Sequence, residues 1–159
     1  MLHMCYMANS LTNRPAELGE HPVVLSWPVQ WGDQDAFGHV NNTVYFRWME
    51  SARIEYFRQA GLGHMMSHQG VGPILASIQC DFRRQLHFPD TILISASVAG
   101  IGRTSLRMVH RLYSTAQQVL AAEGSSVLVM FDYQQQRPVL VSEAIRAAVE
   151  SLERQGKAA

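Results

Sequence analysis

Two different hydrophobic periods meet in the first third of the chain. From residue 23 to residue 31 every odd position is apolar, whereas Ser26, Pro28 and Gln30 occupy even positions. A period of two is typical of a half-buried strand. Because proline has no N–H to donate to a ladder, Pro28 places this strand at a sheet edge or on a bulge.

Residues 43–60 follow the helical period instead. One predicted helix face collects Tyr45, Trp48, Met49, Ala52 and Tyr56, widened by Phe46 and Phe57. Gly61 follows as a helix stop, since glycine readily adopts the backbone conformation that ends helices. So broad an aromatic face predicts a helix wrapped by a sheet rather than one lying on a surface.

The rest of the chain is predicted to be a run of strands closed by a helix. Apolar even positions predict a long antiparallel-type strand over residues 74–88, and β-like runs follow at 91–101, 104–115 and 118–133. The connections GIGR and TAQQ are short enough for hairpins. Good helix formers after Ser142 predict a C-terminal helix. Strands that do not alternate with helices predict an α+β fold, with an antiparallel sheet around one helix.

Length and composition set the domain organisation. A chain of 159 residues with 47% hydrophobic positions can bury one sizeable core. Residues 1–21 contain Asn, Pro, Gly and three methionines, which predicts a disordered N-terminal tail. We therefore expect a single domain over residues 22–155.

Charge and motifs limit the classes of binding partner and cofactor that we expect. Thirteen basic and thirteen acidic residues cancel, so nucleic acid and anionic membranes are not expected partners. No segment approaches the roughly 20 apolar residues of a membrane span. Cys5 and Cys80 fit neither a disulfide framework nor a metal-ligand spacing. We expect a cytoplasmic protein with reduced thiols, no metal and no cofactor, since no nucleotide, phosphate or metal motif is present.

The most polar stretch, QWGDQDAFGHVNNTVY at residues 30–45, joins the first strand to the helix. Asn41 and Asn42 stand at the predicted helix start, where Asn is a favoured N-cap. A helix start also offers unpaired N–H groups and the positive end of the dipole, which can hold an oxyanion. A cap and an oxyanion hole are compatible.

Two acids in this stretch are candidates for chemistry. Asp33 and Asp35 are either turn acids, the commoner fate of Asp in such a segment, or carriers of general-base or nucleophilic chemistry toward an acyl carbonyl. His39 could meet Asp35 across the loop, as hydration or dehydration requires. His110 interrupts an apolar face and is predicted to be a hydrogen-bonded core residue.

The run WGDQDAFGHVNNTVYFRWMESARIEYF resembles the hotdog-fold thioesterases of the 4-hydroxybenzoyl-CoA thioesterase-like group, which includes acyl-CoA and acyl-carrier-protein (ACP) thioesterases. The resemblance covers residues 24–152 and includes GRTSL at 102–106 and DYQQQRPVLV at 132–141. It implies a hotdog fold, in which an antiparallel sheet wraps a long central helix. It also implies hydrolysis of an acyl thioester to an acid and a thiol, a reaction of lipid metabolism.

The resemblance also implies a role for individual residues. Asp35 takes the place of the catalytic carboxylate, and the supporting loop comprises Asp33, Gly38 and His39. The backbone N–H of Asn42 takes the place of the oxyanion contact, with Asn41 and Thr43 beside it. Some relatives have Tyr or His where Asn42 stands, and Asn cannot copy those side chains as acid or base. The implied acyl pocket includes Tyr45 and Ile74, and the implied CoA-binding residues are Arg103 and Thr104.

The same family forms dimers and often tetramers. A homodimer or homotetramer is therefore implied, with active sites at the dimer interface where the partner's residues 70–74 line the acyl pocket. Two alternatives stay open: a hotdog hydratase or dehydratase that uses an Asp/His pair, and a non-catalytic acyl-thioester-binding module. No residue identifies the acyl group, or CoA rather than ACP as its carrier.

Overall fold

The computed structural model describes residues 14–66 and 70–158. Its main elements, in chain order, are β1 (Val23–Pro28), α1 (Asn42–Gln59), β2 (Val71–Phe82), β3 (Thr91–Ile101), β4 (Ser105–Ser114), β5 (Val119–Asp132) and α2 (Glu143–Ala158). Short 3-10 turns, η1 (Ala16–Leu18), η2 (Trp31–Asp33) and η3 (Gly63–Met66), and a two-residue strand, β6 (Arg137–Pro138), complete the order.

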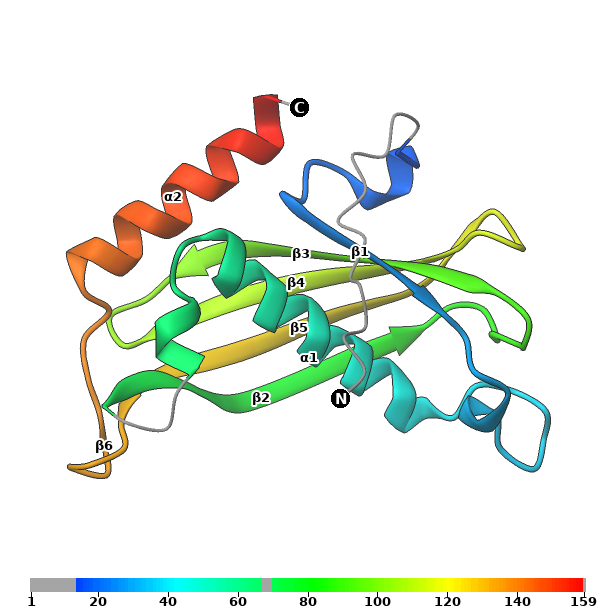
Figure 1. The fold of residues 1–159 in the computed structure, drawn as a ribbon, viewed down its shortest axis with the longest axis horizontal. Helices are drawn as coiled ribbons and strands as arrows, with labels where there is room; N and C mark the ends of the chain where they lie inside the picture. The colour runs from blue at the N-terminus through cyan, green and yellow to red at the C-terminus, as the bar shows by residue number, and fades with distance from the viewer. Residues whose placement is uncertain (1–13, 67–69, 159) are drawn as a thin grey trace.

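The strands form one antiparallel sheet in the order β1-β3-β4-β5-β2, and β6 pairs with β5. Helix α1 runs across one face of this curved sheet, while α2 lies at the β3 side (Figure 1). Strands β1 and β2 are the two edges. The predicted α+β architecture is therefore confirmed, and so is the edge position of the strand that contains Pro28.

The predicted apolar face of α1 is the centre of the core. Tyr45, Trp48, Met49, Ala52 and Tyr56 are all buried. A Cβ on Gly124 of β5 would lie 2.5 Å from Met49 Cε, so any larger residue at this position would require the buried Met49 side chain to shift.

A half-buried carboxylate ties α2 to the rest of the fold. The Tyr56 hydroxyl donates to Glu153 Oε1 at 2.7 Å, and Ser97 Oγ donates to Glu153 Oε2 at 2.8 Å. The Val98 N–H also donates to Glu153 Oε1, at 2.6 Å. Burial, and then Glu153, raise the pKa of Tyr56, so its hydroxyl stays protonated and remains a donor.

Two predicted strands end earlier than the periodicity indicated. The first strand stops at Pro28, because η2 follows and leaves Trp31 76% exposed. The long strand covers Val71–Phe82 rather than residues 74–88. Its regular alternation is broken by a bulge between Leu75 and Ser77 and by its place at the sheet edge, which leaves Ile74 39% exposed.

The predicted tail lies mostly outside the described residues. Within the described part of it, Leu18 of η1 is buried against Leu93 and Tyr113. Cys80 is a free thiol, whereas Cys5 falls in the segment that is not described. Across residues 14–66 and 70–158, no helix combines the length and the apolar character that crossing a membrane requires.

Candidate active site

A small hairpin between η2 and α1 holds Asp35. Gln34 and Val40 form a β-bridge, and the Asp35 N–H donates to the His39 carbonyl at 2.8 Å. The turn closes when the Gly38 N–H donates to the Asp35 carbonyl at 3.0 Å. Gly38 has a φ of 75°, a conformation that residues with a Cβ rarely adopt. Glycine is therefore the residue that this turn requires.

The hairpin is attached to the segment that follows β2. The Val40 N–H donates to the Leu86 carbonyl at 2.8 Å, and His87 Nδ1 donates to the Gly38 carbonyl at 2.9 Å. The rings of His39 and His87 meet edge to face, with centroids 5.0 Å apart. The backbone that carries Asp35 is thus anchored to the connection between β2 and β3, by one backbone hydrogen bond and one from the His87 side chain.

The two acids of the loop have different surroundings. Asp33 uses both oxygens: Oδ2 accepts from the Gln30 N–H at 2.8 Å, and Oδ1 pairs with Arg47 at 3.4 Å. Asp35 accepts one hydrogen bond, from the Phe37 N–H to Oδ1 at 2.8 Å. No other described residue donates to Asp35 Oδ2. Asp33 is a structural acid here, whereas Asp35 keeps one oxygen available.

The start of α1 is capped as predicted. Asn41 is the N-cap, and its Oδ1 accepts from the Thr43 N–H at 3.0 Å and from the Thr43 hydroxyl at 2.7 Å. The Val44 N–H donates to the Asn41 carbonyl. Asn42 is the first helical residue, and no other described residue accepts from its N–H. This N–H and the positive end of the helix dipole are available to an anion.

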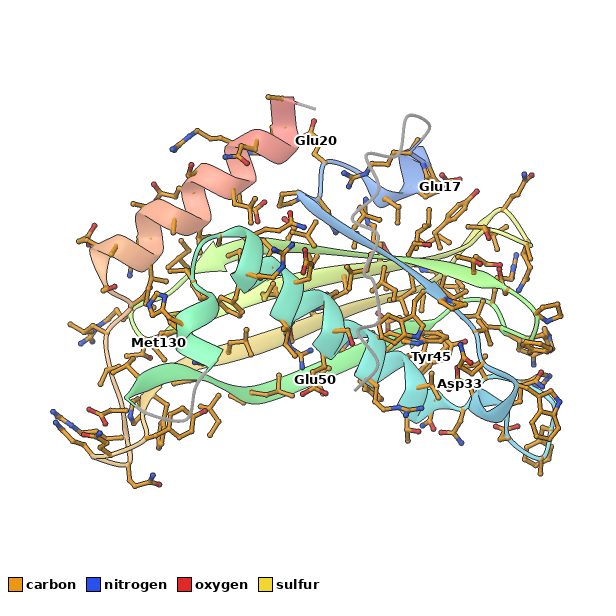
Figure 2. All side chains as sticks on the ribbon, viewed as in Figure 1. Glu17, Glu20, Asp33, Tyr45, Glu50 and Met130 are labelled. Carbon is orange, nitrogen blue, oxygen red and sulfur yellow. The ribbon has the colours of Figure 1, made fainter. Side chains whose placement is uncertain are left out.

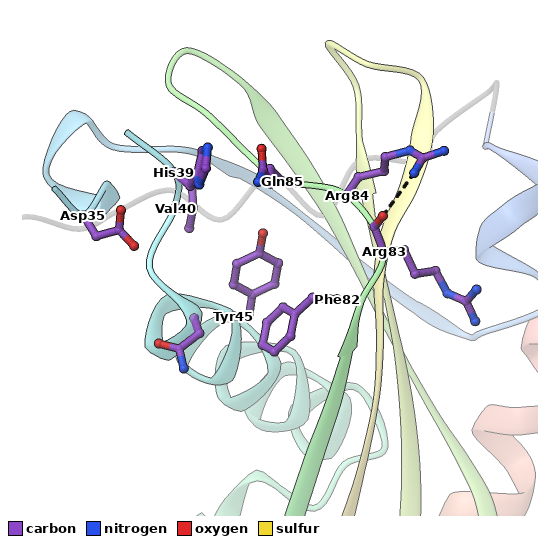
Figure 3. Close-up of a pocket in the computed structure, with 9 residues that line it drawn as sticks. Asp35, His39, Val40, Tyr45, Phe82, Arg83, Arg84 and Gln85 are labelled. Atoms are coloured by element: carbon purple, nitrogen blue, oxygen red, sulfur yellow. Dashed lines mark hydrogen bonds between the residues drawn. The ribbon is translucent and has the colours of Figure 1, made fainter. Parts of the chain in front are cut away.

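Asp35 and the helix start border the same cavity. The cavity has a volume of about 320 Å³ and is lined by Asp35, His39, Val40, Asn42, Tyr45, Phe82, Arg83, Arg84 and Gln85. The Tyr45 and Phe82 rings face it, with centroids 5.0 Å apart, and Asp35 lies across from them (Figure 3). Arg83 and Arg84 stand at the far side. The Asp35 carboxylate, the Asn42 N–H and an apolar wall therefore lie around one cavity within a single chain.

The sequence profile of the thioesterase-like superfamily matches residues 29–149, which is well over half of the chain. The chain belongs to this superfamily. Its resemblance to hotdog thioesterases is confirmed, and so is the hotdog fold.

Solved structures agree with this assignment. A thioesterase of Thermus thermophilus, solved with coenzyme A and Zn, is 33% identical and superposes with a TM-score of 0.74 over 86% of this chain and 98% of that one. The PA2801 protein of Pseudomonas aeruginosa is 32% identical, with a TM-score of 0.71 over 81% of this chain and 97% of that one. The chloroplastic acyl-ACP thioesterase ATL3 of Arabidopsis thaliana is 24% identical over 71% of this chain and 60% of its own length.

Burial controls the protonation of two groups in this thioesterase-superfamily protein. Burial raises the pKa of Tyr45 to about 12, with a smaller contribution from Cys80, so Tyr45 is a neutral hydroxyl at physiological pH. Burial, and then Asp81, raise the pKa of Cys80 to about 11, which keeps it a thiol of low nucleophilicity. Among the described residues, no group of three or more His, Cys, Asp and Glu side chains could hold a metal ion.

Three predicted site residues lie elsewhere in the superfamily fold. Ile74 pairs with Val129, which pairs on its other side with Ser105, next to Arg103 and Thr104. This row is about 26 Å along β2 from Phe82, at a rise of roughly 3.3 Å per residue. Figure 2 shows Met130, a neighbour of this row, at the opposite end of the sheet from Asp33 and Tyr45.

Sequence reasoning missed the cavity wall formed by Phe82, Arg83, Arg84 and Gln85. The signal was present, because three consecutive polar residues interrupt the apolar alternation just before Leu86. Such a break marks the end of a strand. The sequence pattern did not indicate that the break faces Asp35.

Proposed function

We propose that this protein hydrolyses an acyl thioester, carried by coenzyme A or by an acyl carrier protein, to a free acid and a thiol. The observation that supports this is the unengaged Asp35 oxygen in the same cavity as the free Asn42 N–H. Membership of the thioesterase-like superfamily supports it independently.

The proposed mechanism places the thioester carbonyl oxygen on the Asn42 N–H. Negative charge that develops on this oxygen is stabilised there by the amide and the helix dipole. Asp35 then accepts a proton from water as water attacks the carbonyl carbon, or attacks that carbon itself and is released by water. In both routes the C–S bond breaks, and the sulfur leaves as a thiol once protonated.

A panel of acyl-CoAs and acyl-ACPs, from short aliphatic to aromatic, tests this proposal. We expect release of free thiol from at least one of them, followed with a thiol-reactive dye. Ligand binding without thiol release across the panel would instead identify a binding module. Addition of water to an enoyl thioester without thiol release would identify a hydratase.

The geometry favours hydrolysis over an Asp/His hydratase. His39 contributes its carbonyl, not its imidazole, to the hydrogen bond with Asp35. Its ring packs on His87, and no hydrogen bond joins the Asp35 and His39 side chains within the described part of the chain. The Asp35 and His39 side chains are therefore not placed to share a proton, as an Asp/His pair in a hydratase must.

We also propose that two chains pair along β2. This strand is 12 residues long, lies at a sheet edge and exposes Val71, Ile74, Leu75 and Phe82. A long apolar edge is a template for pairing unless something covers it. Antiparallel pairing of two β2 strands around Ile78 would bring the partner's Ile74 next to Phe82, at the cavity. The acyl pocket would then be completed by the second copy.

Replacing Leu75 with Lys tests the pairing. Leu75 is 43% exposed, so the change is tolerated in one chain but places a charge in the proposed interface. We expect the mass in solution, measured by light scattering after size exclusion, to fall from at least a dimer to a monomer. Leu140→Lys, at an exposed apolar residue outside β2, is the matched control. A monomeric wild type, or an equal loss in the control, would contradict the pairing.

A further inference from the structure

Helix α1 contains a buried arginine that lacks an ion-pair partner. Arg53 is only 7% exposed, and its Nη1 has no hydrogen-bond partner among the described residues. No described acid forms a salt bridge with it. A guanidinium keeps its charge in proteins, and burying a charge is costly unless a partner compensates it. Burial accordingly lowers the pKa of Arg53.

An unpaired acid stands one helical turn before Arg53. Glu50 is exposed, and no described residue forms a salt bridge with it. Its negative charge favours the protonated form of Arg53 and so opposes the effect of burial on that pKa. The two side chains nevertheless form no salt bridge with each other in the described chain. An acid and a base thus lie near each other, each without a bonded partner.

Both residues belong to one flank of α1. Residues three and four apart lie on the same side of a helix, and this flank contains Phe46, Glu50, Arg53 and Phe57. Figure 2 shows Glu50 on the β2 side of the helix. Ile54, four residues after Glu50, is 48% exposed. The outer side of the flank therefore presents an acid and an apolar side chain to solvent, next to the sheet edge proposed to pair.

The flank also lies level with the centre of that pairing. Met49, beside Glu50, lies against Gly124, whose β2 partner is two residues from Ile78. Antiparallel pairing around Ile78 has a two-fold axis there, so it brings the two α1 helices side by side in opposite directions. Glu50 and Arg53 are about 4.5 Å apart along the helix, at 1.5 Å per residue. A two-fold axis that passes between them places each Glu50 opposite the Arg53 of the other copy.

We propose that the partner's Glu50 neutralises Arg53, so that two reciprocal ion pairs join the α1 helices of a dimer. The inference rests on the proposed pairing along β2 and names the contact that fixes its register. Among the Arg53 nitrogens only Nη1 is enclosed without a partner, which leaves the rest of the guanidinium within reach of an acid from outside the chain. An apolar edge alone allows several registers, whereas a charge pair of defined geometry selects one.

A charge swap between two copies tests the proposal. Glu50→Arg gives a chain with two arginines on the flank, and Arg53→Glu gives a chain with two acids. Each variant alone should self-associate at least roughly a hundredfold more weakly than the wild type, because like charges then meet in the interface. An equal mixture should form a heterodimer with an affinity close to that of the wild type. Analytical ultracentrifugation measures the dissociation constants, and native mass spectrometry identifies the heterodimer.

Glu143→Arg is the matched control for the charge change. The Glu143 side chain is 95% exposed on α2, away from the flank, so this variant should dimerise as the wild type does. Glu50→Gln provides a second measurement that does not depend on whether Arg53→Glu folds, because Glu50 is exposed. We expect Glu50→Gln to weaken the dimer and to leave the thermal unfolding of the dilute monomer unchanged.

The outcomes separate this contact from the proposals on which it rests. Wild-type association of Glu50→Gln and Glu50→Arg would overturn the ion pair, as would two folded swap variants that form no heterodimer. A monomeric wild type would overturn both the β2 pairing and the ion pair. Loss of association in Leu75→Lys together with wild-type association of Glu50→Arg would keep the β2 pairing and refute only the ion pair. Thiol release is measured separately, so none of these results decides the proposed hydrolysis.

Discussion

The Asp35→Asn variant is expected to hydrolyse thioesters roughly a thousandfold more slowly than the wild type, with the loss in kcat. Asparagine keeps an oxygen that can accept from the Phe37 N–H, so the turn remains. It has neither the charge nor the basicity that water activation or attack on a carbonyl requires. The measurement is thiol release under steady-state conditions with the best substrate of the panel, with thermal unfolding as the check on folding.

Asp33→Asn is the matched control for this change. It keeps an acceptor for the Gln30 N–H and loses an ion pair with Arg47, whose side chain is mostly exposed. Exposed ion pairs contribute little, so we expect less than about a tenfold effect on kcat. Equal losses at the two acids, or a fully active Asp35→Asn, would contradict the assignment of Asp35.

His39→Asn separates the two enzymatic interpretations. The main-chain carbonyl that positions Asp35 is kept in this variant. A thioesterase should therefore retain most of its activity, whereas a hydratase with an Asp/His pair would lose as much as at Asp35. The activity of His39→Asn therefore distinguishes the thioesterase from the hydratase directly.

Acidification from pH 6.5 to pH 4 is expected to lower the free energy of unfolding by about 3 kcal/mol through His110 alone. This residue is 1% exposed and lies 3.3 Å from the Ser95 carbonyl and 3.2 Å from Ser126 Oγ, which confirms that it is a hydrogen-bonded core residue. Burial lowers its pKa to about 3, and the charge of Arg53 acts in the same direction.

The direction in which the free energy of unfolding changes with pH follows from the protons that His110 binds in the folded and unfolded states. Below its ordinary pKa of 6.5, His110 binds a proton in the unfolded chain but not in the folded one until about pH 3. Its contribution is therefore complete above pH 6.5 and is lost as the pH falls toward 3. His21 adds to the same trend, because burial lowers its pKa to about 4.

Urea unfolding at pH 7 and pH 4 measures this loss in the wild type and in His110→Gln. The variant should show a smaller difference between the two pH values, because one titrating group is gone. If it does not fold, the imidazole of His110 can be followed by NMR in the wild type. Titration of that imidazole near pH 6.5 would contradict the prediction.

Local patterns predicted most of the fold, because its elements carry their own periods. The face of α1 from Tyr45 to Tyr56 is buried as its spacing requires. The limits of β2 were not predictable in the same way, since its exposed Ile74 depends on the absence of a neighbouring strand on one side. Edge position is a property of the whole sheet, not of the segment.

The site shows the same division. The cap at Asn41 follows from local chemistry, and the structure confirms it. The difference between Asp33 and Asp35 does not follow from local chemistry, because both residues fit a turn. The partner that distinguishes Asp33 is Arg47, which lies in the next element. The cavity that Asp35 borders includes Phe82, more than forty residues away in the chain. Such a convergence has no local signature.

In the hairpin that carries Asp35, the position of the carboxylate does not depend on which side chains occupy the turn around it. The hairpin's own groups in the hydrogen bonds that hold it, at Asp35, Gly38 and Val40, are backbone atoms, and one of their partners is the His87 side chain. The Phe37 side chain, in contrast, is 85% exposed. Evolution or an engineer can therefore diversify the side chains of Ala36 and Phe37 while the carboxylate stays in place.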